Sequence, residues 1–145
     1  MSRTMRKHFA LWALLLAVSV CSARAAEDAW AEMFRASFRE VPLVVRLQLT
    51  AQRVVKQWPG YVVYEQQGRV LETYKGPRLP RVRYWVWAER GARLPARPGQ
   101  SLIACLTYDA RHREYAVPDN GYLFPATGSM IQLARRLARR PIRRQ

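Results

Sequence analysis

Cys105 and His112 are the one cysteine and the one histidine outside the first 25 positions, and as a pair these residue types could support nucleophilic catalysis. A thiol becomes a strong nucleophile when an adjacent base removes its proton, and an imidazole can be that base. The two residues stand seven positions apart across an expected turn. Cys105 lies inside the apolar run 102–106, as a core cysteine does. The sequence therefore favours a buried structural thiol over a catalytic pair.

A small polar cluster, Asp109, His112 and Glu114, could act on a substrate or hold a cation. Arg111 and Arg113 alternate with it, as in a solvated hairpin loop, and we favour that interpretation. One cysteine and one histidine are too few for a structural zinc site in one chain. The sequence has no glycine-rich phosphate loop, nucleophile elbow or HExxH pattern. We predict no catalytic residue, no metal site and no cofactor, and we expect that the protein is not an enzyme.

Aromatic residues offer a binding surface instead. Small barrels use exposed aromatics next to arginines as stacking platforms for nucleic-acid strands or sugars. Large aromatics are equally typical of cores, so these residues could also pack beneath helices. The sequence leaves both interpretations open. The predicted binding residues of this surface are Trp58, Tyr61, Arg83, Trp85 and Trp87, and Arg46, Arg69 and Arg81 lie beside them.

The segment 130–140 has an apolar face that includes Met130, Leu133 and Leu137, and its opposite face is basic. Such a helix could lie on anionic lipid head groups or bind a polyanion or an acidic protein. It could also dock its apolar face on the fold and leave its arginines in solvent. The predicted binding residues of this segment are Arg135, Arg136, Arg139 and Arg140.

Periodic patterns place these residues on a mainly β framework. Apolar residues alternate with polar ones along the middle of the chain, which is typical of half-buried strands. Gly68 predicts a bulge or a bend, and Asp119–Gly121 predicts a turn. The expected elements are a helix over 28–38, strands over 41–56, 61–74, 82–88, 101–108 and 114–117, an extended piece at 122–124, and a helix over 130–140 capped by Ser129.

Short turns between consecutive strands favour an antiparallel sheet. We predict a small five-stranded antiparallel barrel of the oligonucleotide/oligosaccharide-binding (OB) type, with one helix at each end of the chain. A β-sandwich is the alternative, but it usually needs about seven strands. The strand 82–88 is apolar on both faces, and a helix packed over one of them would explain this.

The N-terminus has the pattern of a cleaved secretory signal over residues 1–25. Three basic residues precede the apolar run 9–21, and Ala23-Arg24-Ala25 supplies the small residues read by signal peptidase. A transmembrane anchor would need about 20 apolar residues, and a lipidated Cys21 would need a small residue in place of Val20. We expect a single domain over 26–140 and a basic tail over 141–145. We expect export, to the periplasm or beyond, after cleavage near Ala25 and Ala26.

The net charge of +15 is concentrated at the two ends of the chain. Loss of the expected signal removes four basic residues and no acid, which leaves +11. Six arginines lie in the last eleven residues, and without them the charge falls to +5. Because the basicity is local and export is expected, we do not expect nucleic acid as a partner.

The region 43–106 resembles the netrin-type OB domain of the tissue inhibitors of metalloproteinases. The resemblance rests on Val54-Val55, the strand 61–64, the segment 70–76 and the Gly99-Gln100 before an apolar strand. It implies five strands flanked by terminal helices. Those inhibitors chelate the protease metal through an N-terminal cysteine, whereas the expected first residue here is Ala26. The family's disulfides are missing too, so the resemblance carries the fold and not the inhibition.

Taken together, the sequence predicts a small exported binding protein of a bacterial-type envelope. We expect its partner to be an envelope or secreted protein. The alternative is a binder of polyanions or anionic membrane surfaces that acts through the C-terminal arginines.

Overall fold

The computed structural model describes residues 23–118 and 122–140. Most of the predicted signal (1–25), the Asp119–Gly121 turn and the tail (141–145) lie outside these residues. The chain divides into two compact units after Glu32. In the first, residues 23–32 are helical, so the helix includes positions before the predicted start at 28. Alanine-rich sequence over 23–29 favours this extension.

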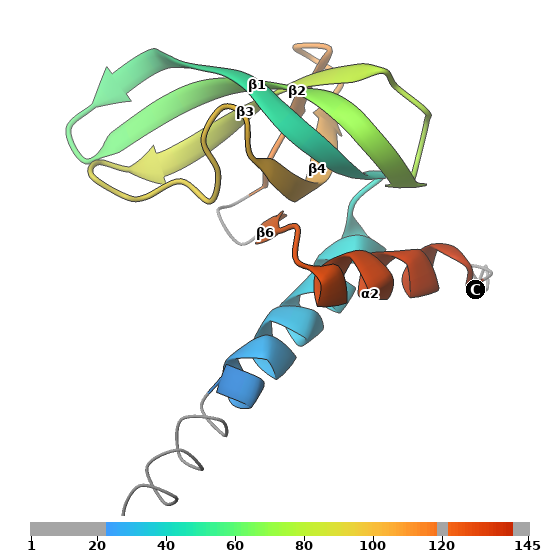
Figure 1. Cartoon of the computed structure of the whole chain (residues 1–145). Coiled ribbons are helices and arrows are strands. Elements are labelled where there is room, and N and C mark those ends of the chain that lie inside the picture. The colour runs from blue at the N-terminus through green and yellow to red at the C-terminus, as the bar shows by residue number, and fades with distance from the viewer. Residues whose placement is uncertain (1–22, 119–121, 141–145) are drawn as a thin grey trace, which may run out of the picture. The chain divides into compact units, whose positions relative to one another are not determined.

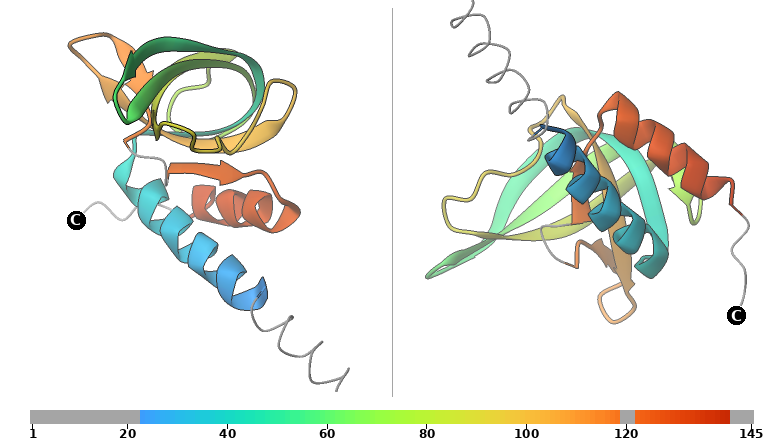
Figure 2. Two further views of the ribbon diagram at one scale, coloured as in Figure 1. Left: turned by 90° about the vertical axis from the view of Figure 1, so that its left-hand side faces the viewer. Right: turned by 90° about the horizontal axis from the view of Figure 1, so that it is seen from below.

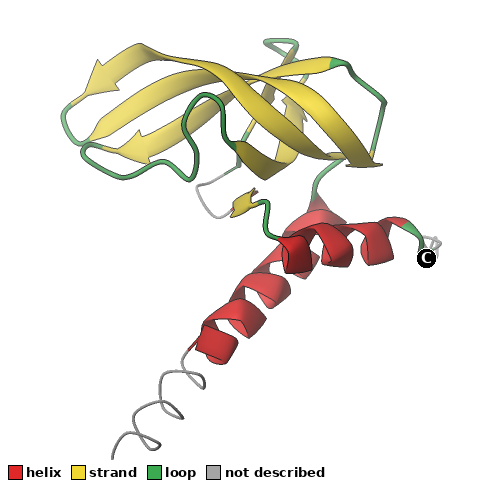
Figure 3. Ribbon diagram, in the orientation of Figure 1, coloured by secondary structure: helices red, strands yellow, loops and turns green. Residues whose placement is uncertain are grey.

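The second unit contains the sheet and two helical segments (Figures 1 and 3). Residues 33–40 are helical, and a six-stranded sheet follows before the last helix. The strands are β1 (Leu43–Trp58), β2 (Tyr61–Lys75), β3 (Arg81–Glu89), β4 (Ser101–Asp109), β5 (Glu114–Ala116) and β6 (Leu123–Pro125), and the helix is α2 (Gly128–Ala138).

The strand pairing closes on itself. The order is β1-β2-β3-β5-β4-β6, and β1 also pairs with β4, so five strands form a ring (Figure 2, left). Most of β1 pairs with β2, while its first part, Leu43 to Gln48, also pairs with β4. The first part of β1 therefore lies between β2 and β4, and its residues there are largely buried.

The predicted purely antiparallel sheet is wrong, because β3 and β5 run parallel. The other pairs of the ring are antiparallel. A ring of five strands cannot alternate direction all the way around, so one pair must be parallel. The strand number is also six, because β6 pairs with β4 at the segment predicted as a short extended piece.

The core lies inside the ring. Side chains on β3 alternate, with Val82, Tyr84 and Val86 buried against Leu residues of β1 and β4. Within the described residues, no helix fully covers the other face of β3, where Trp87 is 49% exposed. A helix over one face of this strand was expected, and at Trp87 the face outside the core is left exposed instead.

A bulge or bend was predicted at Gly68, and the bulge lies opposite it, on β1. The β1–β2 register shifts between Leu49 and Ala51, which leaves Thr50 as the extra residue of a bulge. Gly68 lies against β1 so closely that a Cβ would stand 2.6 Å from Leu47 Cδ1 and 3.2 Å from the Gln48 carbonyl oxygen. The absence of a side chain at Gly68 thus allows β1 and β2 to approach each other closely where the ring bends.

The last helix is capped by Thr127 rather than by Ser129. Thr127 Oγ1 accepts the backbone N–H of Met130 at 3.3 Å, which satisfies one of the free donors of the first turn. α2 buries Met130, Leu133 and Ala134. Its apolar face is therefore packed within the fold, and the arginines lie on the other side.

Candidate functional site

Two tryptophans from different strands stack at one end of the ring. Trp58 at the end of β1 lies 5.2 Å from Trp87 of β3, centroid to centroid, with the ring planes 12° apart. The Nζ atom of Lys56 lies 4.4 Å from the Trp58 ring centre, within cation–π range. Trp87 is 49% exposed and Tyr61 52% exposed. This Trp58–Trp87 pair with Lys56 and Tyr61 is called the aromatic face below.

Strand register builds this face. Trp58 pairs with Tyr61 across the β1–β2 hairpin, whose turn contains Gly60 at φ 90°, a conformation that favours glycine. Val63 of β2 pairs with Trp87 of β3. The sheet therefore holds the aromatic rings on rigid strands, so little conformational entropy is lost if a ligand contacts them.

A cleft of about 200 Å³ adjoins Trp87. Its walls come from β3, from β5 and from the turn between β4 and β5. The cleft combines aromatic walls with two carboxylates and an imidazole, which suits a ligand with both apolar and polar groups. The lining residues are Trp85, Trp87, Asp109, His112, Glu114, Tyr115 and Ala116.

The turn at the cleft is held by Asp109. One carboxylate oxygen accepts the backbone N–H of Arg111 at 2.8 Å and that of His112 at 3.3 Å. The other lies 2.7 Å from His112 Nδ1. This hydrogen bond and the carboxylate charge raise the pKa of His112, and the same contact lowers the pKa of Asp109. The polar cluster predicted as a solvated loop is therefore an ordered turn with an exposed imidazole.

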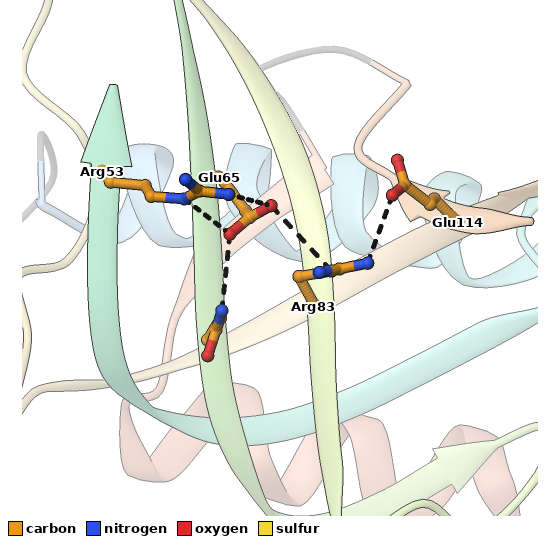
Figure 4. Close-up of polar contacts among 5 residues, drawn as sticks. Arg53, Glu65, Arg83 and Glu114 are labelled. Carbon is orange, nitrogen blue, oxygen red and sulfur yellow. Dashed lines mark hydrogen bonds and ion pairs between the residues drawn. The ribbon is translucent and has the colours of Figure 1, made fainter. Parts of the chain in front are cut away.

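Arg83 links three strands through carboxylates (Figure 4). The side chain of Glu65 on β2 is 5% exposed, and its two carboxylate oxygens accept hydrogen bonds from Arg53 at 2.9 and 3.2 Å. Arg83 Nε lies 3.9 Å from Glu65 Oε2. Arg83 also pairs with Glu114 of β5 at 3.3 Å. The hydrogen bond from Arg53 lowers the pKa of Glu65 despite its burial. Arg83, predicted as a binding residue, therefore already has two carboxylate partners.

Cys105 and His112 do not form a pair. Cys105 is fully buried on β4, and burial raises the pKa of its thiol. The His112 side chain is 73% exposed and faces Asp109. A protonated, inaccessible thiol is a poor nucleophile, so this arrangement offers no support for cysteine chemistry.

The C-terminal arginines divide into two groups. Arg135 makes two hydrogen bonds to Glu72 of β2, at 2.8 and 3.0 Å, which ties α2 to the sheet. Arg136, Arg139 and Arg140 are exposed. Glu72 also accepts from Tyr74, and burial raises the pKa of that phenol to about 12. Of the arginines that the structure describes in this segment, Arg135, Arg136, Arg139 and Arg140, none lines the cleft, so the predicted binding residues belong to two separate surfaces.

Sequence reasoning missed Tyr108 and Lys56. Tyr108 is 51% exposed and packs edge-to-face on Tyr115, with ring centres 5.2 Å apart. The sequence held a signal for Tyr108, because it ends the apolar strand directly before the polar turn at Asp109. The sequence analysis placed Lys56 only on a strand, although Lys56 and Trp58 are two positions apart and alternation therefore puts both side chains on one face.

Within residues 23–118 and 122–140, no helix is both long and apolar enough to cross a bilayer. The same residues contain no group of three or more His, Cys, Asp or Glu side chains placed to hold a metal ion. Comparison of the chain with protein-family models and with curated proteins finds no match.

Proposed function

We propose that this is an exported, non-enzymatic binding protein of a bacterial-type envelope, and that the aromatic face and its cleft bind another envelope or secreted protein. The observation that carries the proposal is the exposed Trp58–Trp87 stack. Tryptophan, tyrosine and arginine dominate the binding energy of protein interfaces. A half-exposed tryptophan held on a strand costs little entropy on binding.

We further propose that the ring is a small OB-type barrel. The closed pairing of five strands supports this, because closure removes the free edges that an open sheet would expose. OB barrels bind ligands on the face of strands 2 and 3 and with the loops after strands 1 and 4. The aromatic face lies beside the β1–β2 turn, and the Asp109 turn joins β4 to β5, which supports this proposal.

Affinity capture with matched variants tests the protein-binding proposal. The tagged full-length protein, Trp87→Ala and Leu71→Ala are each used to capture proteins from envelope extract. Leu71, on β2, is 39% exposed and outside the cleft, so it controls for the loss of an exposed apolar side chain. We expect one reproducible partner for the parent and Leu71→Ala that is lost, or about ten-fold reduced, with Trp87→Ala. Equal capture by all three proteins would contradict the proposal.

A second candidate function is polyanion binding through Arg136 of α2 and through Arg139 and Arg140, which directly follow the helix; all three are exposed. The packed apolar face of α2 favours a soluble polyanion over insertion into a membrane surface. Replacing all three with glutamine should lower the salt concentration that elutes the protein from heparin. Unchanged elution would exclude this surface.

A further inference from the structure

A basic groove lies on the outer surface of β1, β2 and β3. It has a volume of about 470 Å³ and is lined by side chains of Thr50, Gln67, Arg69, Arg81 and Arg83. The Thr50 bulge contributes to its edge, and Thr50 Oγ1 donates to the Gln67 carbonyl oxygen at 3.0 Å. The groove therefore combines guanidinium, amide and hydroxyl groups.

Arg69 and Arg81 are direct cross-strand partners in the β2–β3 ladder. Side chains at such positions have Cβ atoms about 5 Å apart, and like charges there destabilise the sheet. Arg83 is two residues from Arg81 and on the same face of β3, which is exposed at both positions. Arg69, Arg81 and Arg83 therefore all line one groove, and the packing of the core does not explain why they are arginines.

The carboxylates of this surface are already paired elsewhere. Glu65 binds Arg53 and Arg83, and Glu114 binds Arg83 (Figure 4). Arg69 donates to a neutral acceptor, Gln48 Oε1, at 3.0 Å. Among the described residues, no carboxylate oxygen lies within ion-pair distance of Arg69 or Arg81. The like-charged pair is therefore left without a counter-charge from the protein.

We infer that this groove binds a doubly charged tetrahedral oxyanion, a phosphate or a sulfate group, between Arg69 and Arg81. Two guanidinium forks match the several acceptor oxygens of such a group, and two negative charges balance the two unpaired arginines. Arg83 also lines the groove, but it stays paired with Glu65 and Glu114, so the inference rests on Arg69 and Arg81. The site is distinct from the aromatic face, so it does not depend on the protein-binding proposal.

Calorimetric titration of the full-length protein with inorganic sulfate and inorganic phosphate, at ionic strength fixed with chloride, tests the inference. We expect saturable binding of one anion, and about ten-fold weaker binding for Arg69→Gln and for Arg81→Gln. The matched control is Arg93→Gln. Arg93 is exposed in a loop outside the groove, and its substitution by glutamine removes the same charge. Acetate, with one charge, should bind more weakly than either tetrahedral ion.

Two further measurements test the role of the anion's second charge and of the like-charged Arg69–Arg81 pair. At about pH 5 phosphate loses its second charge while sulfate keeps it, so phosphate affinity should fall and sulfate affinity should not. Thermal melting in chloride should show that Arg81→Gln is at least as stable as the parent, because a like-charged pair is removed. Absence of saturable binding, or equal weakening by Arg93→Gln and Arg81→Gln, would overturn the inference. Loss of anion binding with intact capture by the aromatic face would leave the protein-binding proposal untouched.

Discussion

At the scale of single residues, the polar side chains near the cleft are organised by hydrogen bonds and not by charge alone. Asp109 accepts from two backbone N–H groups and from the His112 ring. Glu65 stays ionised at low exposure because Arg53 binds it with two hydrogen bonds. Asp109 and His112 line the cleft, whereas Glu65 connects β2 to β1 and β3 outside it. The sequence predicted the Asp109 cluster but not its hydrogen bonds.

The Asp109–His112 contact predicts a pH-dependent turn. Because the folded state raises the pKa of His112, the stabilisation is full below the unfolded value near 6.5 and is lost as pH rises through the folded value. Asp109→Asn should lower the titration midpoint of His112, measured by NMR of the imidazole protons. Asn can still accept the two backbone N–H bonds, so the turn is retained as a control. An unchanged midpoint would show that the contact does not exist in solution.

At the scale of elements, most strands and their closure into a five-stranded ring were predicted, but the direction of one strand pair was not. Alternation located β1, whereas β3 has apolar residues on both faces and was located by its run of apolar and aromatic residues. The purely antiparallel arrangement was wrong at β3–β5, because a closed ring with an odd number of strands needs a parallel pair and no local pattern shows which pair it is. The N-cap of α2 is Thr127, whereas Ser129 was predicted. Both residue types are good caps, and the packing of Met130 and Leu133 sets where the helix starts.

The candidate site was predicted in part. Trp58, Tyr61, Trp85 and Trp87 do lie on one surface, because strand register brings them together. The sequence could not decide between exposure and burial, since a strand with apolar residues on both faces fits either. The arginines of α2 share the basicity of the candidate site but lie on another surface.

The tight crossing of β1 and β2 gives a prediction about Gly68. Gly68→Ala places a methyl group 2.6 Å from the buried Leu47 side chain, so the strands must separate or Leu47 must repack. We expect a loss of about 1–3 kcal/mol in the free energy of unfolding, measured with urea. Gly128→Ala is the control, because a Cβ there meets nothing within 4 Å. Equal stability of the two variants would contradict the close crossing.

At the scale of the whole molecule, charge is distributed unevenly among separate surfaces. The chain has 25 Lys and Arg residues for 10 Asp and Glu, so many cations have no carboxylate of their own. The described carboxylates on the sheet hold strands and α2 together, as Glu65 and Glu72 show. Arg69 and Arg81 in the groove and three exposed arginines in and after α2 are left without such a carboxylate, while the aromatic face carries Lys56 over Trp58. Different parts of the surface are therefore suited to different ligands.

The most direct test of the central claim is photo-cross-linking in cells that make the protein. A benzophenone amino acid replaces Tyr61 in one variant and Leu71 in a second, so that Trp58 and Trp87 stay in place. Both positions are exposed, but only Tyr61 belongs to the aromatic face. If the aromatic face binds a protein, we expect a discrete adduct with another envelope or secreted protein from position 61 and none from position 71. Adducts of equal yield from both positions, or none from position 61, would contradict the proposal.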